Sequence, residues 1–382
     1  MYAICKIGIR YYSIKCSLSS RAALTMANSH FSNPKQINVK EPEVCLNHVR
    51  DSVPRIVEPE LVEVIRRFDD FCYYTGPNRE LYPSLVLIDS YKIFEDPNNL
   101  TPENLKLASI LAWCFENATT SMLVNDDIMD EQGVRWKKKC WHLRSHIGLT
   151  ALVDAKQLTV SSYFLMKKYF KKHPFYVDFV NLLAESLQRT VFGQSADVSS
   201  SEQFKRNRNI QFLSKQTYIS NVIYKSAYSI YKIPVLAAMR FANVTKSNSF
   251  NLIADVLLML AIYRQAQNDM WDVFGKYETI GKYGTDLVKG RCTWLTATVA
   301  EHGTDQQKAL FCKNYGKENA KCQNTIIGLF ADLGMIEKFL QYKENLITDL
   351  HKKMDDVVDP KMKRLVKLFI ENYVDVDENL KV

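Results

Sequence analysis

Residues 101–130 read TPENLKLASILAWCFENATTSMLVNDDIMD, and this stretch decides the fold class. Thr101 is a favoured residue before a helix, Pro102 is favoured in the first turn, and Glu103 places negative charge at the start. The residues that follow carry little charge until Asp126. This pattern predicts a long helix that is buried at the centre of the protein and ends in a group of carboxylates.

The rest of the chain shows helical periodicity and few residues that break helices. Gly and Pro number 13 and 11 in 382 residues, which argues against a fold of many turns. No apolar run approaches the roughly 18 residues of a membrane span, so none is expected. The nine cysteines are odd in number and lack a Cys-x-x-Cys pair, which fits free thiols. We predict an all-α fold in one domain, with further helical segments at 55–72, 150–170, 176–198, 208–240, 250–274, 305–316, 318–355 and 360–373.

The net charge of +8 is unevenly distributed along the chain. Residues 1–40 contain no acidic residue and six basic ones, namely Lys6, Arg10, Lys15, Arg21, Lys35 and Lys40. Residues 41–382 hold 44 basic and 42 acidic residues, and this near-neutral balance argues against a nucleic-acid-binding protein. The basic leader 1–40 fits either an organelle transit peptide or a disordered segment with Met26 as an internal start. Mitochondrial and cytoplasmic localisation therefore both stay open.

Two short acidic segments carry the chemistry, residues 126–130 (DDIMD) and 268–272 (NDMWD). On a helix, Asp126 and Asp130 share a face, and Asp127 lies beside them. Carboxylates this close repel one another, and Mg²⁺ removes the repulsion while it keeps phosphate and water as further ligands. A single segment of this kind is more often a solvated acidic face. Two of them, each at the end of an apolar helix, predict a metal cluster that binds a diphosphate.

Basic residues follow or lie between these segments. Arg135 follows the first one, and Lys282 lies in residues 281–286 (GKYGTD) after the second. Lys225 stands among aromatic residues in 221–231 (NVIYKSAYSIY), where a lysine is costly unless it meets an anion. Each of them alone could be a surface cation with a partly covered side chain. Together they predict a cradle for phosphate groups.

Five longer stretches carry a resemblance, namely 113–130 (WCFENATTSMLVNDDIMD), 193–198 (GQSADV), 224–239 (YKSAYSIYKIPVLAAM), 265–286 (QAQNDMWDVFGKYETIGKYGTD) and 291–295 (RCTWL). They resemble the trans-isoprenyl diphosphate synthase family, which includes the farnesyl diphosphate synthases. The resemblance covers residues 55–350. It implies an isoprenoid synthase helical bundle around a central active-site cavity over residues 41–382, and a homodimer. It also implies Mg²⁺ as the cofactor, with about three ions bound together with diphosphate.

The resemblance also implies roles for individual residues. The implied metal ligands are Asp126, Asp127, Asp130, Asn268, Asp269 and Asp272. The implied diphosphate-binding residues are Arg79, Arg135, Lys225, Gln265 and Lys282, with Asp286 as a further polar group. Catalytic roles are implied for Asp126, Asp127, Asp130 and Lys225.

A second substrate site departs from the family pattern. The family joins an allylic diphosphate to isopentenyl diphosphate, and its second site uses a Gly-Gly-Lys-x-x-Arg segment. Here Gly76 replaces the lysine, Thr119 replaces a glutamine and Trp136 replaces an arginine, while residues 374–382 (VDVDENLKV) replace a basic tail. Losing two charge-assisted contacts of roughly 1.5–3 kcal/mol each would weaken anion binding by orders of magnitude. On the allylic side, the one departure is Asn268 in place of an aspartate.

The apolar pocket is also expected to differ. Ser121 and Met122 lie one helical turn before Asp126, where the farnesyl-making branch commonly has aromatic residues. This predicts a deeper pocket with room for a fifteen-carbon chain, with a repacked core as the alternative. Aromatic faces could stabilise a carbocation by about 1–2 kcal/mol each, although ordinary packing is the alternative for each of them. The candidates are Phe115, Tyr224, Tyr228 and Trp271.

These departures favour a sesquiterpene synthase that ionises farnesyl diphosphate, cyclises the cation and releases diphosphate. It would be similar to insect terpene synthases of this origin, which make pheromone precursors such as sesquipiperitol or bisabolene. One alternative is a prenyltransferase that makes farnesyl or geranylgeranyl diphosphate. Another is a non-catalytic partner subunit of such an enzyme. The intact Asp126, Lys225 and Lys282 count against the non-catalytic alternative.

Overall fold

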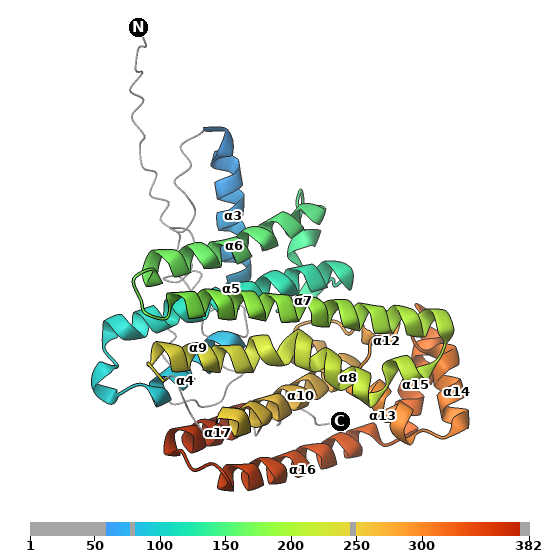
Figure 1. The fold of residues 1–382 in the computed structure, drawn as a ribbon. Helices are drawn as coiled ribbons and strands as arrows, with labels where there is room; N and C mark the ends of the chain where they lie inside the picture. Colours follow the sequence, from blue (N-terminus) through green and yellow to red (C-terminus); the bar gives the residue numbers. More distant parts are fainter. Residues whose placement is uncertain (1–58, 77–80, 245–249, 375–382) are drawn as a thin grey trace. The chain divides into compact units, whose positions relative to one another are not determined.

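The computed structural model describes residues 59–76, 81–244 and 250–374. All of these residues belong to one unit, Val39–Val382. Apart from one pair of two-residue strands, every regular element in this part of the chain is helical (Figure 1). The all-α prediction is confirmed. The predicted leader 1–40 lies outside the described residues.

The regular elements follow one another along the chain, and the short η elements are 3-10 turns except for the π-helix η7. They are η1 (Pro59–Leu61), α3 (Val62–Thr75), α4 (Tyr82–Phe94), η3 (Pro97–Asn99), α5 (Pro102–Met129), β1 (Val134–Arg135), β2 (Lys138–Lys139), η4 (Trp141–Leu143), η5 (Gly148–Thr150), α6 (Ala151–Phe170), α7 (Tyr176–Asn207), η6 (Ile210–Leu213), α8 (Lys215–Val222), η7 (Ile223–Lys232), α9 (Ile233–Phe241), α10 (Phe250–Phe274), α11 (Tyr277–Ile280), α12 (Asp286–Lys289), α13 (Trp294–His302), α14 (Asp305–Asn314), α15 (Ala320–Asp332), α16 (Met335–Asp355) and α17 (Pro360–Tyr373).

The helix α5 begins where the sequence predicts. The Thr101 hydroxyl accepts a hydrogen bond from the Asn104 N–H at 3.2 Å, and Pro102 is the first helical residue. The helix packs against α4 and α6, and most of its middle is buried. By length and composition α5 could also cross a membrane, which the sequence-based expectation overlooked. Because 72% of its most apolar window is buried against the rest of the protein, it is the core helix of this fold.

Several elements differ from the predicted segments, and the short helices α11, α12 and α13 are among those that were not predicted. The helix α4 was not predicted, because its residues are apolar on nearly every side and show no polar face. It packs between α5 and α9, which accounts for this composition. The predicted segment 318–355 is two helices, α15 and α16. The chain turns at Gly334, whose φ of +61° lies in the left-handed region that glycine adopts without strain.

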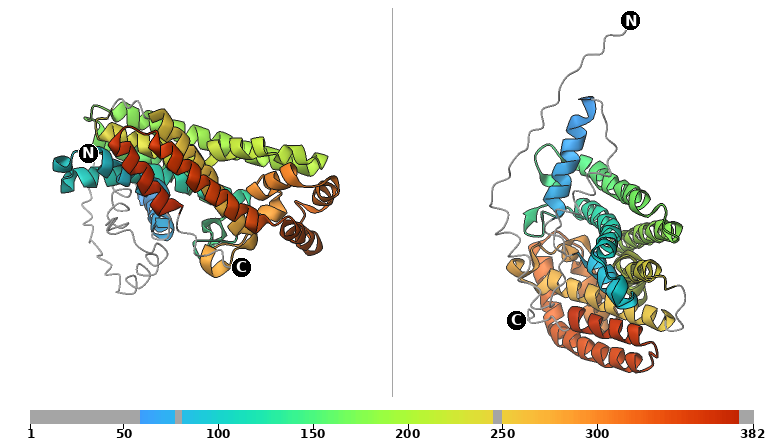
Figure 2. Two further views of the ribbon diagram at one scale, coloured as in Figure 1. Left: turned by 90° about the horizontal axis from the view of Figure 1, so that it is seen from below. Right: turned by 90° about the vertical axis from the view of Figure 1, so that its left-hand side faces the viewer.

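The helix α10 is the second central element of the core. It contacts η7 on one side and α13, α16 and α17 on others, and these elements share one cluster of buried apolar side chains. Figures 1 and 2 show α16 and α17 running beside α10. The two aspartate segments lie at the C-terminal ends of α5 and α10, two helices that pack in the core. The core therefore fixes the backbone of both segments before any ligand is considered.

Candidate active site

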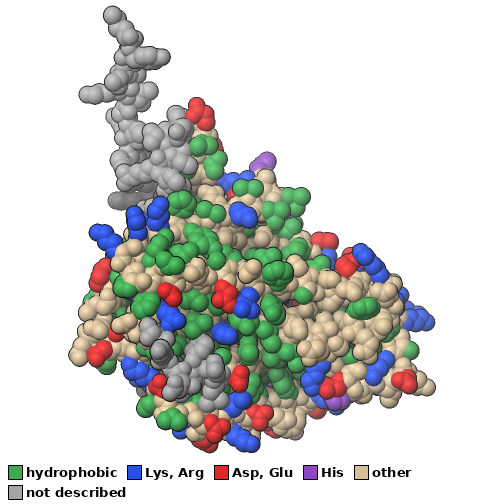
Figure 3. Space-filling view, in the orientation of Figure 1, with side chains coloured by type: hydrophobic (Ala, Val, Ile, Leu, Met, Phe, Trp, Pro, Cys, Tyr) green, Lys and Arg blue, Asp and Glu red, His purple; other side chains and the backbone are tan. Residues whose placement is uncertain are grey.

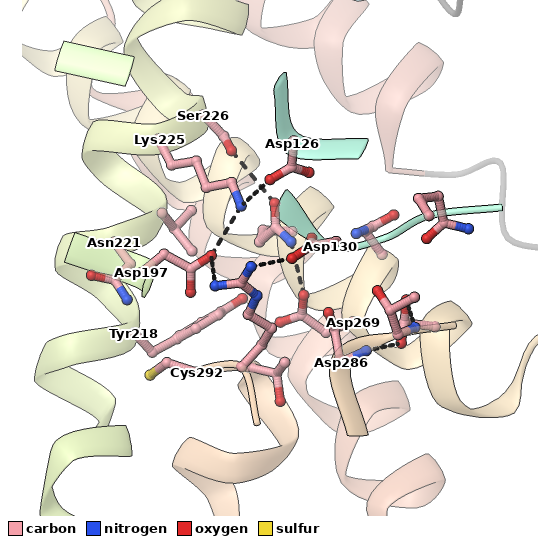
Figure 4. A pocket seen from close by; sticks show the side chains of 18 of the residues that line it. Asp126, Asp130, Asp197, Tyr218, Asn221, Lys225, Ser226, Asp269, Asp286 and Cys292 are labelled. Carbon is pink, nitrogen blue, oxygen red and sulfur yellow. Dashed lines mark hydrogen bonds and ion pairs between the residues drawn. The ribbon is translucent and has the colours of Figure 1, made fainter. Parts of the chain in front are cut away.

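Both aspartate segments line one polar pocket (Figure 4). The helix α5 contributes Asp126 and the residue at its C-terminal end, Asp130. The helix α10 contributes Asn268, Asp269 and Asp272. The cavity between them measures about 80 Å³, which is the room of a handful of water molecules. Charged side chains from both helices and the loops around them fill the remaining space.

Asp126 is the best neutralised carboxylate of the pocket. Its Oδ1 atom accepts hydrogen bonds from Gln194 Nε2 at 2.7 Å and from Lys225 Nζ at 3.3 Å. Its Oδ2 atom lies 3.9 Å from an Arg135 nitrogen. Burial alone would raise the pKa of Asp126, but Lys225, Arg135 and Arg291 together lower it to about 2. This carboxylate is therefore ionised at every physiological pH.

Asp127 has a different role from its neighbour. It is buried, and its Oδ1 atom accepts a hydrogen bond from Arg135 Nε at 2.6 Å and forms an ion pair with a terminal nitrogen of the same guanidinium at 2.6 Å. It is not among the residues that line the pocket. Burial raises the pKa of Asp127 although Arg135 opposes this. The structure thus uses Asp127 to hold Arg135, which does line the pocket, and the metal-ligand role implied for Asp127 stays a prediction.

Lys225 lies in the π-helix η7 between two carboxylates. Its Nζ atom is 2.9 Å from Asp197 Oδ2 and 3.3 Å from Asp126 Oδ1. Burial lowers its pKa, but Asp126 and Asp197 raise it further, so the side chain stays charged. A Cβ atom on Gly193 of α7 would lie 2.1 Å from the Lys225 backbone N. The absent side chain at Gly193 lets α7 and η7 approach closely enough for this contact.

In the second segment, Asp269 is surrounded by neutral donors. Asp269 accepts hydrogen bonds from Gln265 Nε2 and from the Trp294 backbone N–H, each at 2.8 Å. Burial raises the pKa of Asp269 to about 7, with the Trp294 and Gln265 hydrogen bonds opposing and the Asp272 charge adding to the rise. No lysine or arginine is recorded within ion-pair distance of Asp269 among the described residues.

Asp272 fixes the loop that follows α10. Its carboxylate accepts the backbone N–H groups of Asp286 at 3.0 Å and Thr285 at 3.3 Å. Lys282 Nζ lies 3.8 Å from the same carboxylate. Burial, together with the nearby Asp272 and Asp269, raises the pKa of Asp286 well above its ordinary value. The implied grouping of Gln265, Lys282 and Asp286 with the second segment therefore holds in space, since all three line the pocket.

Sequence reasoning missed three residues of this site. Asp197 and Gln194 on α7 contact Lys225 and Asp126. Arg291, in the loop before α13, forms an ion pair with Asp130 and lies 3.9 Å from Asp197. All three stand in stretches that match the family pattern, at 193–198 and 291–295, so the signal was present. It was passed over because the side chains that these residues contact come from other elements of the fold.

A short hairpin joins the surroundings of the two segments. After α5, β1 pairs with β2 in an antiparallel ladder, and the turn residue Trp136 has φ +52°. The Lys137 N–H donates to the Gly281 carbonyl at 2.8 Å. Gln132 Nε2 donates to the Tyr283 carbonyl at 3.0 Å. The loop after the first segment is thus hydrogen-bonded to the loop after the second.

Several predicted pocket residues lie elsewhere. Phe115 is buried in the core, and Ser121 accepts a hydrogen bond from the Thr159 hydroxyl on α6 at 2.8 Å. The Trp271 ring packs under the Arg264 guanidinium at 4.7 Å. None of the predicted apolar and aromatic residues lines the polar pocket, and the deeper pocket stays a prediction. This set is Phe115, Ser121, Met122, Tyr224, Tyr228 and Trp271. Arg79 and most of the acidic tail lie outside the described residues.

The pocket has the donors that a hard divalent cation prefers. Six aspartates line it against four lysines and arginines, so carboxyl groups outnumber the cations. The raised pKa of Asp269 reflects the cost of an ionised carboxylate in that buried position. Within the described ranges, no three Asp, Glu, His or Cys side chains converge closely enough to hold an ion alone. We therefore expect diphosphate oxygens and water to complete any metal site here.

The chain belongs to the polyprenyl synthetase family, because a profile of that family matches residues 73–332. It is an enzyme of this family. Among curated relatives, the farnesyl pyrophosphate synthase of Kluyveromyces lactis is 30% identical, over 82% of this chain and 89% of that protein. The farnesyl pyrophosphate synthase of Candida albicans is 31% identical, over 77% and 84%. A T. brucei farnesyl diphosphate synthase complexed with a bisphosphonate has the same fold, with a TM-score of 0.79 at 21% identity over 88% of this chain and 99% of that one.

These relatives correct the hypothesis of a sesquiterpene synthase. At about 30% identity over most of the chain, the relatives are named farnesyl pyrophosphate synthase, and they favour the prenyltransferase alternative. The lyase and pheromone assignments lose their support for the same reason. The hypothesis depended on Gly76, Thr119 and Trp136. Single missing residues were a weak guide, because a cation from another helix can stand near the same place.

Proposed function

We propose that this protein is a prenyltransferase that joins an allylic diphosphate to isopentenyl diphosphate and releases diphosphate. One observation carries the proposal. Carboxylates at the ends of α5 and α10 face each other across a pocket that also holds Arg135, Lys225 and Lys282. Excess carboxylate and fixed cations together suit a metal-bound diphosphate leaving group. The names of the relatives give the reaction class.

Each side chain has a distinct task in this reaction. Lys225, held between Asp126 and Asp197, and Arg135, held by Asp127, present fixed positive charge to the diphosphate oxygens. Fixed charges stabilise the departing diphosphate without reorganising when the carbon–oxygen bond breaks. The new bond joins the allylic carbon to the terminal alkene carbon of isopentenyl diphosphate. The proton lost from the adjacent carbon passes to the released diphosphate.

A metal ion would be held by carboxylates of both segments. The residues in position are Asp126 and Asp130 on one side, and Asp269 and Asp272 on the other, with Asn268 as a neutral oxygen donor. Bound Mg²⁺ would neutralise the diphosphate and make it a better leaving group. The protein itself supplies the orientation of the carboxylates, since Gln194 and Trp294 hydrogen-bond Asp126 and Asp269.

The test is chain elongation by the purified full chain. The protein is incubated with Mg²⁺, labelled isopentenyl diphosphate, and dimethylallyl or geranyl diphosphate. We expect labelled products longer by one five-carbon unit or more, and no product without Mg²⁺. Release of a volatile hydrocarbon or alcohol from farnesyl diphosphate, with no incorporation of label, would overturn the proposal.

We propose that Arg264 supplies part of the positive charge that binds isopentenyl diphosphate at the second substrate site. It lies on α10 one turn before Asn268, which lines the pocket. Its guanidinium donates to the Tyr82 hydroxyl at 2.8 Å and to Gln267 Oε1 at 2.6 Å. Its guanidinium carbon lies 5.0 Å from the centre of the Tyr82 ring and 4.7 Å from that of Trp271. Tyr82 follows closely in sequence after Gly76, where the family lysine is missing, so the cation stands near the same stretch of chain.

Substrate-specific kinetics separate this role from a structural one. We expect Arg264→Met to raise KM for isopentenyl diphosphate by about tenfold, as loss of one charge-assisted contact predicts, with KM for the allylic substrate nearly unchanged. Arg189→Met is the control, since Arg189 also stacks on an aromatic ring, that of Tyr228, but lies on α7 and not one turn from Asn268. Equal effects of Arg264→Met on both KM values would contradict the assignment.

A second copy of the chain is the partner that we propose for an exposed apolar face. On α6, α7 and η7, a group of large apolar side chains is more than two-fifths exposed. Figure 3 shows hydrophobic side chains gathered on this face. Apolar patches of this kind mark interfaces more often than free surface. The residues are Leu152, Val153, Val160, Phe164, Val177, Val191, Phe192 and Tyr224.

Light scattering during size exclusion tests this assembly. We expect the full chain to elute with the mass of two copies, and Phe192→Asp to shift it toward one. Val358→Asp is a matched control, because Val358 is 89% exposed but lies outside this face. A single-copy mass for the unmodified protein at micromolar concentration would overturn the assignment.

A further inference from the structure

Arg291 is the one pocket cation that comes from the loop between α12 and α13. Its backbone is fixed at both ends: the N–H donates to the Asp286 carbonyl at 3.2 Å, and its carbonyl accepts the Tyr315 hydroxyl at 2.8 Å. Tyr315 is buried, and the Arg291 side chain is only 9% exposed. The guanidinium therefore has little freedom to leave the pocket for solvent.

The guanidinium lies between carboxylates of two different helices. One terminal nitrogen pairs with Asp130 at the end of α5, and the other lies 3.9 Å from Asp197 on α7. Figure 4 shows Asp130 and Asp197 on opposite sides of this group. The Nε atom is buried and has no hydrogen-bond acceptor among the described residues. A buried guanidinium with a donor left over is unusual, because an unmet donor costs free energy.

Asp130 is also one of the carboxylates in position to hold a metal ion. A guanidinium and a divalent cation repel each other at short range, so they cannot both contact Asp130 cheaply. A metal ion that arrives alone must break the Asp130 pair and leave a buried arginine without its partner, which is costly. A metal ion that arrives with diphosphate brings an anion that can accept from Arg291, including its unmet Nε donor.

We propose that Arg291 is an internal counter-cation of the first aspartate segment, which competes with metal at Asp130 until diphosphate takes its place as the partner of the guanidinium. Metal and diphosphate then bind with positive coupling, because each removes part of the cost of binding the other. This inference rests on the metal-dependent diphosphate chemistry proposed above. It assigns Arg291 a role in the order of binding and not only in holding the fold.

A nearby ion pair provides the contrast. Lys289 Nζ lies 3.0 Å from Glu131, the residue after Asp130, but Glu131 is 82% exposed. This pair is screened by solvent and lies outside the pocket, so removing Lys289 should not change metal binding. Replacing Lys289 or Arg291 by glutamine thus removes one positive charge in either case. Arg291 lies in the pocket, whereas Lys289, two residues before it, lies outside.

The test measures Mn²⁺ affinity of the full chain, with and without inorganic pyrophosphate, by paramagnetic resonance or calorimetry. We expect Arg291→Gln to bind Mn²⁺ alone about tenfold or more tightly than the unmodified protein. The gain in Mn²⁺ affinity that pyrophosphate produces should shrink in this variant. The Mn²⁺ affinity of Arg291→Lys should lie between those of Arg291→Gln and the unmodified protein, because lysine keeps the charge but cannot bridge both carboxylates as a guanidinium does. Lys289→Gln should match the unmodified protein.

An unchanged or lower Mn²⁺ affinity in Arg291→Gln, with its melting temperature intact, would overturn the proposal. So would an equal rise in Lys289→Gln, since that would reveal a general charge effect. If Arg291→Gln does not fold, Arg291→Lys decides, and a lack of any rise in its affinity for Mn²⁺ alone overturns the proposal. If the unmodified protein binds no Mn²⁺ even with pyrophosphate, the proposed function fails as well. Mn²⁺ binding that is unaffected by Arg291 refutes this inference alone.

Discussion

The two aspartate segments share a pocket and a sequence pattern, yet their electrostatic surroundings are opposite. Asp126 on α5 is in contact with Lys225 and near Arg135, and despite burial these charges lower its pKa to about 2. Asp269 on α10 accepts only from neutral donors, and burial raises its pKa to about 7. Asp126 is neutralised by cations of the protein itself, whereas Asp269 has no such partner among the described residues. Similar motifs therefore need not bind ions in the same way.

We expect the largest effect on turnover from removing Asp126, the carboxylate that Lys225 and Arg135 neutralise. We expect Asp126→Ala to lower the rate of pyrophosphate release from an allylic diphosphate by about a hundredfold to a thousandfold or more. The variant loses a metal-facing carboxylate and leaves Lys225 with a single partner. Asp178→Ala is the control, since Asp178 is 45% exposed and pairs with Arg240 away from the pocket. Full turnover by Asp126→Ala would show that the first segment does not act on the substrate.

Gly193→Ala tests the same part of the pocket, because Gly193 lies against the backbone of Lys225. Gly193→Ala would place a methyl group 2.1 Å from the Lys225 backbone N, so α7 and η7 must separate. We expect a loss of about 3 kcal/mol in the free energy of unfolding, measured by urea denaturation. Gly328→Ala on α15 is the matched control: no atom lies within 4 Å, and the helix should gain about 0.5–1 kcal/mol. Equal stability of both variants would contradict the close packing.

A carboxylate outside the pocket tests how far burial alone raises a pKa. Burial raises the pKa of Asp89 on α4 to about 7, although Lys92 opposes this. Since the folded pKa lies above the ordinary value of 3.8, the folded protein keeps a proton that the unfolded chain loses. The Asp89 contribution to stability is therefore present below about pH 4 and is lost as pH rises to about 7.

Asp89→Asn should remove this dependence. Between pH 5 and pH 8, we expect the unmodified protein to lose about 2 kcal/mol of unfolding free energy relative to the variant. Asp255→Asn serves as the control because Asp255 is 63% exposed. If unfolding free energy changed with pH in the same way in Asp89→Asn and in the unmodified protein, burial would not raise the pKa of Asp89 as proposed.

The smallest expected effects come from replacing Asp126 or Asp269 by asparagine, and these two variants compare the segments most directly. Without metal, Asp269→Asn should raise the free energy of unfolding by about 1 kcal/mol, because it removes a buried charge that meets only neutral donors. Asp126→Asn should lower it by about 1 kcal/mol, because it takes a charged partner from Lys225. Thermal melting in the presence of a chelator measures both. Changes of the same sign would remove the difference between the segments.

Much of this architecture could be predicted from local sequence. The cap at Thr101, the apolar run after it and the acidic end at Asp126 define α5, because each of these signals acts over a few residues. The helix α4 was missed, since a helix buried on all sides has no polar face to reveal its period. The break at Gly334 was missed because the apolar pattern continues across it.

The site was predictable only in part. Arg135 follows the first aspartate segment closely in sequence and Lys282 follows the second, so each of these two groupings could be inferred from spacing. Asp197 and Arg291 come from α7 and a distant loop, and only the folded chain brings them to 3.9 Å from each other. The neutral surroundings of Asp269 depend on a backbone N–H from Trp294, which has no signature in side-chain composition.

The hairpin after α5 has a consequence for how the protein responds to electrolytes. At about 0.1 M ionic strength, exposed charges more than about 10 Å apart are largely screened from one another. The links from Lys137 to Gly281 and from Gln132 to Tyr283 are made through carbonyl groups, which mobile ions do not screen in this way. The loops that follow the two carboxylate segments are therefore joined to each other by uncharged hydrogen bonds, in addition to the apolar packing of α5 and α10. A salt concentration that weakens substrate binding should therefore leave the distance between the two segments unchanged.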